Sequence, residues 1–461
     1  MTELKLPMSV ERRNKLDISL GYCADIVPDK LASFGPGLEV KVDDPAQLVD
    51  FLQHDASENR LYFVPQLRSR DKEWEYVCFA KRGPWSAFCS IFSTSLAYNP
   101  MFGDGKRRRL VCGGTRIIAR SDLEKAVHHG FADRDAELTA AVEMDLDLSE
   151  AMTGKNLSNG FNIGGSKTLV YVDDSQGDGE GLVAKADVRH FAHFMAKLHN
   201  SICQSIPIFV GTGSDLNFAE HGNAYYDHAS RISPNYVGNP QSARRWNRVA
   251  SDNTTLPTAN GVNACLRAVI HHLDVGSSER GILVKGLGGI GRRVAHAYAD
   301  AGWQVYATEV RKELADRMDA ELGDKLKLVD EDDWGTLRGV SIFSPNASSG
   351  SVTSKNLPAL KAMGVRAVVG GENNILDHDL DPQIVHDEGL LTFADFLLNG
   401  GGAWVVGAEM LERPVENVND WITKYQVPTT LATIEMAHDQ GRSPQLLFRE
   451  FIAKKVAELI A

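Results

Sequence analysis

Two lysines twelve positions apart are the residues of this chain with the clearest chemical potential. Lys155 and Lys167 lie in the run Met152-Thr-Gly-Lys-Asn-Leu-Ser-Asn-Gly-Phe-Asn-Ile-Gly-Gly-Ser-Lys167. A lysine among small residues can be desolvated, which lowers its pKa from about 10.4 toward neutrality and lets it act on a carbonyl, an imine or a bound water. A second lysine at fixed reach can hold a substrate carboxylate as a point charge. The pair therefore predicts a site for a small carboxylic acid.

A glycine loop about 120 residues further on predicts a dinucleotide site. An apolar strand, 281–285, leads into Gly286-Leu-Gly288-Gly289-Ile290-Gly291, and a helical pattern follows. Gly286 permits the tight turn, Gly288 lets the backbone approach a pyrophosphate, and Gly291 allows close helix packing. The helix N-terminus then faces the negative charge. With a hydride carrier beside the two lysines, the sequence indicates oxidation or reduction of a 2-amino or 2-oxo acid.

The residues after the next strand indicate which coenzyme is used. Strand 304–308 ends in Glu309, whose carboxylate would accept hydrogen bonds from both ribose hydroxyls and repel a 2′-phosphate. NAD is therefore favoured, although Arg311 and Lys312 follow at once and leave NADP open.

Composition and charge exclude several other classes of protein. With 461 residues, 43% of them hydrophobic and 24% charged, the chain is long enough for two or three ordinary globular domains. The net charge of −12 argues against a nucleic-acid partner, and we interpret the basic cluster 106–109 as a solvated turn. The six scattered cysteines offer no metal framework and make structural disulfides unlikely in a reducing compartment. The chain shows neither a signal peptide nor a long apolar run, so we expect a soluble, cytoplasmic protein with no membrane contact.

Apolar periodicity predicts the elements that must position these residues. Short runs between 76 and 118 indicate strands, Lys167 precedes a strand at 168–172, and 187–199 has the pattern of an amphipathic helix. The polar segment 230–255 is typical of a domain connection. Beyond it the pattern alternates between helix and strand to about residue 400 and ends in helices, with the clearest segments at 259–272, 340–344, 365–369, 429–440 and 443–460.

This order predicts an α/β protein with two domains separated by a cleft. Residues 1–240 would form an α/β substrate-binding domain, whose first 75 residues are an extra segment without a motif. Residues 255–400 would form a Rossmann-type, doubly wound dinucleotide-binding domain. Residues 401–461 would be helices that fold back over the cleft or the first domain.

Several segments of the chain resemble the motifs of a known family. The segment from Met152 to Asp173 looks like the substrate-binding signature of the glutamate, leucine, phenylalanine and valine dehydrogenases, and is most similar to the leucine dehydrogenase branch. The resemblance covers roughly residues 85 to 410. Four more segments resemble family motifs in the same order: Cys112-Gly-Gly-Thr-Arg116, Thr258-Ala-Asn-Gly-Val262, Gly371-Glu-Asn-Asn374 and Asp395-Phe-Leu-Leu-Asn399-Gly-Gly-Gly402.

The resemblance implies roles for particular residues. Lys155 would bind the substrate carboxylate with the backbone of Gly113 and Gly114, and Lys167 would polarise the water that attacks the imine. Asn374 and Thr258 would position nicotinamide and substrate. Two further asparagines belong to this set. Asn399 would brace the cleft, and Asn346 would contact the coenzyme. Related enzymes assemble through their first domain, so a homo-oligomer is expected.

One departure from the family pattern concerns the catalytic base. Family members have an aspartate just before a Val-Gly step, where it shuttles the proton to and from the amine. Here Phe209 occupies that place, before Val210-Gly211. Asp215, six residues on, is the nearest acid and could take over the role. In addition, Ser166 replaces the third glycine before the catalytic lysine.

The expected pocket indicates the class of substrate. Glutamate-specific relatives have a lysine just before Gly-Gly, where this chain has Cys112, and Ala403 and Val406 follow Asn399 on the pocket wall. The predicted pocket has no cation that would pair with a second carboxylate of the substrate. An apolar substrate side chain is therefore expected, and Phe209 would add to the apolar wall.

Three functions are therefore open at this stage. The leading one is reversible, NAD(P)-dependent oxidative deamination of an apolar L-amino acid to the 2-oxo acid and ammonia. The second is a specialised biosynthetic relative that acts on an unusual amine or imine, or condenses substrates, because Phe209 replaces the catalytic aspartate. The third is a non-catalytic, NAD-binding regulatory protein.

Overall fold

The computed structural model describes most of the chain and divides it into two compact units. The described residues are 4–5, 26–70, 72–92, 98–120, 123–124, 130–173, 188–215, 222–237, 254–347, 349–377, 379–411 and 417–460. The first unit consists mainly of 26–237 and 403–411, and the second mainly of 254–402 and 417–457. Most of the predicted connection, 238–253, lies outside the described residues.

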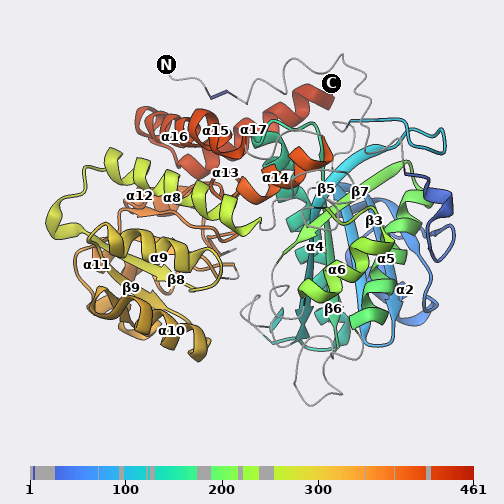
Figure 1. Ribbon diagram of the computed structural model, residues 1–461, viewed down its shortest axis with the longest axis horizontal. Helices are drawn as coiled ribbons and strands as arrows, with labels where there is room; N and C mark the ends of the chain where they lie inside the picture. Colours follow the sequence, from blue (N-terminus) through green and yellow to red (C-terminus); the bar gives the residue numbers. More distant parts are fainter. Residues whose placement is uncertain are drawn as a thin grey trace. The chain divides into compact units, whose positions relative to one another are not determined.

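The first unit is built on a seven-stranded mixed sheet (Figure 1). Its strand order is β1-β2-β3-β4-β6-β5-β7, with β2, β3, β4 and β6 antiparallel in succession and β5 parallel to both β6 and β7. The described part of the predicted N-terminal extra segment supplies β1, β2 and the start of β3. The strands are β1 (Leu38–Glu39), β2 (Tyr62–Ser69), β3 (Lys72–Arg82), β4 (Trp85–Phe92), β5 (Arg109–Ala119), β6 (Gly164–Val172) and β7 (Ile208–Ser214).

Helices cover both faces of this sheet and give it two cores. One core lies under α2 and α4, and the other under α5 and α6. The helix predicted at 187–199 is confirmed, and it continues to Ser205. The helical elements of this unit are η1 (Pro28–Lys30), α2 (Pro45–His54), α4 (Arg134–Ser158), α5 (Val188–Ser205) and α6 (Gly222–Ile232), to which α14 (Gly401–Met410) adds its residues from Ala403 on.

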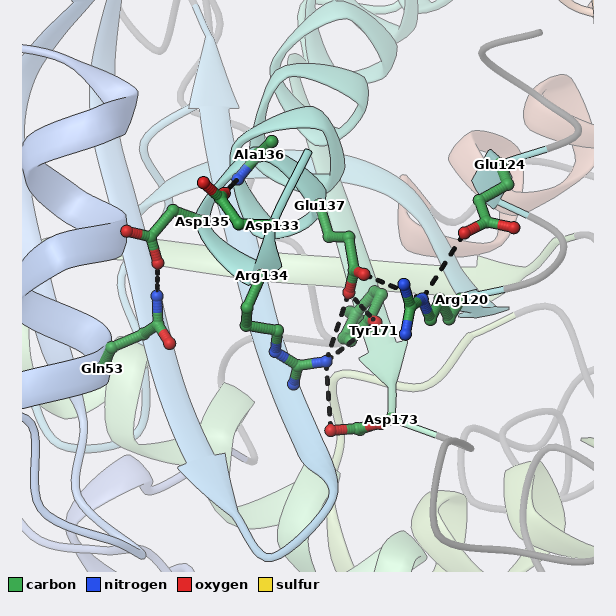
Figure 2. Close-up of polar contacts among 10 residues, drawn as sticks. All are labelled: Gln53, Arg120, Glu124, Asp133, Arg134, Asp135, Ala136, Glu137, Tyr171 and Asp173. Atoms are coloured by element: carbon green, nitrogen blue, oxygen red, sulfur yellow. Dashed lines mark hydrogen bonds and ion pairs between the residues drawn. The ribbon is translucent and has the colours of Figure 1, made fainter. Parts of the chain in front are cut away.

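The start of α4 is anchored by a buried carboxylate (Figure 2). Glu137 accepts a hydrogen bond from the Tyr171 hydroxyl (2.8 Å), and its other oxygen lies 2.8 Å from Arg120 Nε. Arg134 donates to the same tyrosine oxygen at 2.9 Å and pairs with Asp173 at 3.1 Å. The cluster thus fixes the first turn of the helix to the ends of β5 and β6. The far end of the same helix bears Lys155.

We expect Glu137→Ala to lower the free energy of unfolding by about 2–3 kcal/mol, because it leaves a buried tyrosine hydroxyl and two guanidinium groups without their shared acceptor. Asp135→Ala is the matched control. Asp135 is also in the first turn of α4 but is exposed, so its loss should cost less than about 0.5 kcal/mol. Urea unfolding measures both, and equal effects would show that Glu137 contributes no more than a surface charge.

The second unit is a parallel sheet with the strand order β10-β9-β8-β11-β12 (Figure 1). The order reverses between β8 and β11, which is the switch point where open α/β sheets bind ligands. The predicted strands 281–285 and 304–308 are confirmed, 340–344 is extended by Pro345, and 365–369 shrinks to two residues. The strands are β8 (Gly281–Lys285), β9 (Gln304–Thr308), β10 (Leu326–Leu328), β11 (Val340–Pro345) and β12 (Ala367–Val368).

Helices alternate with these strands and continue beyond the sheet. They are α8 (Thr255–His272), η4 (Ser277–Glu279), α9 (Gly291–Asp300), α10 (Lys312–Leu322), η5 (Gly323–Lys325), η6 (Glu331–Thr336), α11 (Leu357–Met363), α12 (Pro382–Asp387), α13 (Asp395–Leu398), α15 (Val418–Trp421), η8 (Ile422–Gln426), α16 (Val427–Gln440) and α17 (Pro444–Ile460). The predicted end of α16 is found at Gly441, which adopts a left-handed conformation with a φ of 62°.

The C-terminal helices are divided between the two units. They were expected over the cleft or the first domain, but α15, α16 and α17 group with the second unit. The buried Gln426 amide donates to the carbonyls of Leu397 and Leu398, and Arg449 lies 3.5 Å from Asp395. These polar contacts tie the helices to α13. Of the segment 401–461, the described residues that join the first unit are mainly 403–411.

The basic cluster 106–109 is the expected solvated turn only in part, because Lys106 and Arg107 are exposed whereas Arg108 is buried. Arg108 is 2% exposed, donates two hydrogen bonds to Asp104 at 2.8 and 2.7 Å, and donates a third to the Cys203 carbonyl. Its guanidinium carbon lies 5.2 Å from the Phe102 ring centre. The cation is buried because a nearby carboxylate and an aromatic face compensate its lost hydration.

Neither a membrane span nor a metal cluster is found in the part of the chain that the structure describes. None of its helices is long and apolar enough to cross a bilayer. Within the same residues, histidine, cysteine, aspartate and glutamate form no group of three that could hold a metal ion.

Candidate active site

The structure distributes the predicted site residues over the two units. The first unit holds the lysines and their surroundings, namely Lys155, Lys167, Cys112, Gly113, Gly114, Phe209, Asp215, Ala403 and Val406. The second unit holds the glycine loop and the polar residues around it, namely Thr258, Gly286, Gly288, Gly289, Ile290, Gly291, Glu309, Arg311, Asn346, Asn374 and Asn399.

Lys167 lies inside β6 and is covered by α4. The sequence predicted a lysine at the mouth of a strand, but β6 begins three residues earlier, at Gly164. At Gly165 a Cβ atom would lie 2.2 Å from the Ser149 carbonyl oxygen, so only glycine lets the helix pack this closely. The Lys167 side chain is consequently only 4% exposed. Close packing of helix on strand is what removes water from the ammonium group.

Three charged side chains meet at the carboxyl end of β7. Asp215 Oδ2 accepts hydrogen bonds from Lys167 Nζ and from Arg116 Nε, the latter at 3.0 Å. The Asp215 side chain is 18% exposed, whereas the two cations are nearly buried. Thus one carboxylate oxygen serves both cations, and the aspartate is the member of the cluster with access to solvent.

The surroundings lower the pKa of Lys167 below its usual value of 10.5. Burial is the main cause, and the nearby positive charge of Arg116 acts in the same direction. The Asp215 carboxylate and, more weakly, Asp145 oppose the shift. The amine therefore becomes neutral at a lower pH in the folded protein than in free lysine. A group that takes up and releases protons during catalysis requires such a shift.

Two of these groups were not predicted from the sequence. Arg116 lies in the Cys112-Gly-Gly-Thr-Arg116 motif but was given no role. Asp145, on α4, is fully buried and accepts a hydrogen bond from the Ser90 amide at 2.9 Å, and Ser90 is the β4 residue paired with Lys167. Burial raises the pKa of Asp145 well above its usual range, and the charge of Lys167 lowers it.

Glycines leave space around the lysine cluster. A Cβ atom at Gly114 would lie 3.2 Å from Asp215 Cβ and 3.4 Å from Lys167 Nζ. At Gly113 it would lie 1.6 Å from the Ser166 carbonyl oxygen, so a side chain there is incompatible with the approach of β5 to β6. Gly113 and Gly114, which were predicted to lie beside the substrate, are therefore next to Lys167 and to the strand that carries it.

The end of α4 positions Lys155. This residue lies in the last turn of the helix and is 9% exposed. The neighbouring Asn156 amide donates to the Cys112 carbonyl at 3.2 Å and to the Gly164 carbonyl at 3.0 Å, which ties the helix end to β5 and β6. The Cys112 thiol is buried, which raises its pKa to about 12, so it is a neutral and weakly polar group.

Phe209 does not join the charged cluster. It is fully buried, and its ring centre lies 5.3 Å from that of Phe102. Further along β7, a Cβ atom at Gly213 would contact Val406 of α14 at 3.5 Å. Val406 is buried and Ala403 half-buried. The predicted wall residues of α14 therefore belong with β7 in the first unit.

The glycine loop of the second unit is hydrogen-bonded to the carboxylate of Glu309. Glu309 accepts a hydrogen bond from the Leu287 amide at 2.6 Å and one from the Arg311 amide at 3.0 Å. Gly286 has a φ of 84°, which favours glycine, and a Cβ atom at Gly291 would lie 1.8 Å from the Gly286 carbonyl oxygen. Gly288 is different, because a Cβ atom there would meet only the Arg311 guanidinium, at 3.5 Å.

The remaining predicted residues brace the loops around this turn. The Asn399 amide donates to the carbonyls of Gly371 and Glu372 and to the Asn373 side chain. The Thr258 hydroxyl donates to the Thr254 carbonyl and accepts from the Gly402 amide, so both its hydrogen-bonding functions are used inside the second unit.

The other two asparagines differ in their surroundings. Asn346 accepts a hydrogen bond from the Gly371 amide at 2.9 Å. Asn374 is half-buried, has a positive φ of 48°, and accepts a hydrogen bond from the Gly350 amide at its carbonyl.

Comparisons with known proteins agree with the resemblance seen in the motifs. The chain is 28% identical to the phenylalanine dehydrogenase of Lysinibacillus sphaericus over 305 residues, which are 65% of this chain and 69% of that enzyme. It is 26% identical to the leucine dehydrogenase of Geobacillus stearothermophilus over 332 residues, 66% of this chain and 82% of that enzyme. No family model matches the chain.

The fold is also that of solved dehydrogenases. The L-tryptophan dehydrogenase of Nostoc punctiforme has a TM-score of 0.55 at 20% identity, over 84% of this chain and 96% of that one. The solved structures confirm the predicted two-domain α/β fold. The sequence relatives support the predicted superfamily, that of the glutamate, leucine, phenylalanine and valine dehydrogenases, with the leucine, phenylalanine and valine branch represented among them.

Proposed function

We propose that this protein is an NAD-dependent dehydrogenase that oxidatively deaminates an L-amino acid with an apolar side chain. The observation on which this chiefly rests is the buried Lys167 amine, which has a lowered pKa and is hydrogen-bonded to the partly exposed Asp215. The similarity to phenylalanine and leucine dehydrogenases supports the same reaction class.

In this mechanism the lysine and the aspartate divide the proton transfers. Lys155 binds the substrate carboxylate, and Lys167 in its neutral form accepts a proton from the water that attacks the imine carbon. Asp215 takes the proton from the substrate amine before oxidation and exchanges it with solvent, because it is the exposed member of the cluster. Asp215 thus takes the role that relatives assign to an aspartate at the position of Phe209.

The residues of the glycine loop fit NAD. A dinucleotide site requires three features, which are close helix packing, an open backbone beside the pyrophosphate and an acid for the ribose. The candidates here are Gly291, Gly288 and Glu309, respectively. NAD, when bound, would accept the hydride from the substrate's α-carbon. Because Glu309 faces its own loop and repels a 2′-phosphate, NAD is favoured over NADP, with Arg311 the residue that would have to turn outward for NADP.

The substrate side chain is apolar in this proposal. Cys112 is neutral and buried, and Val406 and Gly213 add further apolar surface to the same unit. A substrate with a second carboxylate would have to bury that charge without a partner, at a cost of several kcal/mol. Burying a leucine-sized side chain instead gains about 1.5–3 kcal/mol.

A panel of substrates tests the proposed function. NADH formation is followed by absorbance with each L-amino acid and NAD, and ammonia is measured in parallel. We expect one molecule of ammonia per NADH, and a kcat/KM for an apolar amino acid at least about 100-fold above that for glutamate. No NADH from any amino acid, and none consumed with the matching 2-oxo acids and ammonia, would refute the proposal.

Two glycine substitutions separate coenzyme contact from loop structure. Gly288→Ala should weaken NADH binding at least about tenfold without loss of stability, because its methyl group meets only a flexible guanidinium but blocks the approach of a pyrophosphate. Gly291→Ala should weaken binding and also cost about 1–3 kcal/mol of stability, since its methyl group meets backbone.

The control for both is Gly276→Ala, at a position with open space and a φ of −69°. NADH fluorescence titration and urea unfolding give the two quantities. Unchanged NADH affinity in Gly288→Ala would contradict the coenzyme site.

A further inference from the structure

A buried carboxylate joins two loops of the second unit. Glu372 lies in the loop after β12 and is 2% exposed. Its Oε1 accepts the Ser351 amide hydrogen at 2.9 Å, and its Oε2 accepts from the Ser351 hydroxyl at 2.7 Å and the Ala347 amide at 3.2 Å. Both donor residues belong to the loop after β11. The carboxylate therefore fastens one loop to the other at the carboxyl-terminal edge of the sheet.

The end of β8 and the glycine loop after it contact the same pair of loops. The Asn346 amide nitrogen donates to the Lys285 carbonyl at 2.7 Å, and its side chain accepts from the Gly371 amide at 2.9 Å. A Cβ atom at Gly371 would lie 2.8 Å from Ile290 Cδ1, so Ile290 packs on this glycine. The loops after β8, β11 and β12 thus form one connected surface at the switch point, where parallel sheets bind dinucleotides.

Glu372 is poised between its two charge states near neutral pH. Burial raises its pKa to about 7, while the hydrogen bonds from Ser351 and Ala347 and the positive charge of Lys285 act in the opposite direction. Lys285 also pairs with Glu331 at 2.7 Å. A carboxylate whose pKa is raised on folding destabilises the protein once it ionises, and that effect sets in as the pH rises from about 4.5 to about 7. Such a group is a candidate for a functional role.

We propose that Glu372 is a positioning residue for the coenzyme, and that its hydrogen bonds hold the loops after β11 and β12, most firmly in its neutral form, in the arrangement that receives the nicotinamide half of NAD. The adenosine half belongs on the other side of the switch point, near Glu309 after β9. This inference rests on the proposed function only in taking NAD as the ligand.

Ionisation must weaken the connection between the loops. Three donors face the two carboxylate oxygens, and two of these donors are backbone amides on different oxygens. In the neutral form the acid can donate its proton to the Ser351 hydroxyl, and both oxygens keep a lone pair for the amides of Ala347 and Ser351. Burial disfavours the ionised carboxylate, which gains hydration if the loops separate, so the loop after β11 should move away when Glu372 is ionised.

The test is NADH affinity as a function of pH, measured by fluorescence titration between pH 5.5 and 8.5. We expect the wild-type protein to bind NADH about tenfold more weakly at pH 8 than at pH 6. ADP-ribose, which lacks the nicotinamide ring, should change less than about twofold over the same range when measured by competition.

Two variants assign the effect to Glu372. Glu372→Gln cannot ionise, so it should bind NADH as tightly at pH 8 as at pH 6. Ser351→Ala retains the carboxylate but removes one hydrogen bond that lowers its pKa, so the midpoint of the pH dependence should move upward. This second variant keeps the test valid if Glu372→Gln does not fold.

The possible outcomes separate the two proposals. NADH binding that is equal at pH 6 and pH 8 in the wild-type protein, or a wild-type pH dependence in Glu372→Gln, would overturn the role of Glu372 and leave the dehydrogenase proposal standing. No NADH binding at any pH would overturn both.

Discussion

Lys167→Met is expected to lower kcat/KM for deamination by about 10³-fold, the middle of the range for loss of one acid–base group. The effect should appear in turnover and not in NADH affinity, because the lysine lies in the first unit and the glycine loop in the second. Rates are followed by NADH absorbance, and NADH affinity by fluorescence titration.

The stability of the same variant distinguishes lost chemistry from lost structure. The folded protein disfavours the charged ammonium, as the lowered pKa of Lys167 shows, so the charge costs stability at every pH below that pKa. Methionine removes the charge and fills similar volume, and the free energy of unfolding should therefore not fall. Lys72→Met, on an exposed lysine paired with Glu150, is the control and should change kcat/KM less than about twofold. A folded Lys167→Met protein with more than about a tenth of wild-type kcat/KM would refute the assigned role.

Asp215→Asn has the second large effect. It should reduce kcat by about 10²- to 10⁴-fold, because the amide neither accepts the amine proton nor passes it to solvent. It should also move the acidic limb of the kcat/KM profile to lower pH. The direction follows from the charges: the Asp215 carboxylate raises the pKa of Lys167, and its removal leaves burial and Arg116 to lower that pKa further. Wild-type turnover, or a limb that moves to higher pH, would contradict the proposal.

Phe209→Asp is the companion experiment, because an aspartate at this position is what the relatives' pattern would supply. Phe209 is fully buried against Phe102. An aspartate there would lose the packing of the ring and bury an unpaired charge, so we expect a loss of at least about 3 kcal/mol in urea unfolding and no gain in activity. A stable variant with faster deamination would show that Asp215 is not the acting base.

The sequence predicted best the features that depend on local chemistry. Strand β8, the glycine turn and Glu309 follow one another within about 30 residues, and each is specified by residue types that few other structures require. Asp215 was proposed as the nearest acid along the chain, and the structure places it on the Lys167 amine. Asp215 directly follows β7, so the course of the strand itself brings it to the lysine.

The sequence could not predict which charged residues are buried. Asp145 stands among other acidic residues of α4 and has the pattern of a solvated helix face, yet its side chain lies under the helix beside Ser90. Arg108 looked like one of four cations in a turn, and its burial depends on the carbonyl of Cys203, which comes from α5, as well as on its neighbours Asp104 and Phe102. Burial of a charge is decided by distant partners, so spacing along the chain does not reveal it.

The ionisation of Lys167 is the most direct test of this account. The side-chain nitrogen can be followed by nuclear magnetic resonance in ¹⁵N-lysine-labelled protein, with its signal assigned by its absence in Lys167→Met. We predict that the amine loses its proton at a pH clearly below 10.5, and at a lower pH still in Asp215→Asn. A midpoint at or above 10.5 in the folded wild-type protein would show that the amine is not desolvated, and it would contradict the proposed chemistry.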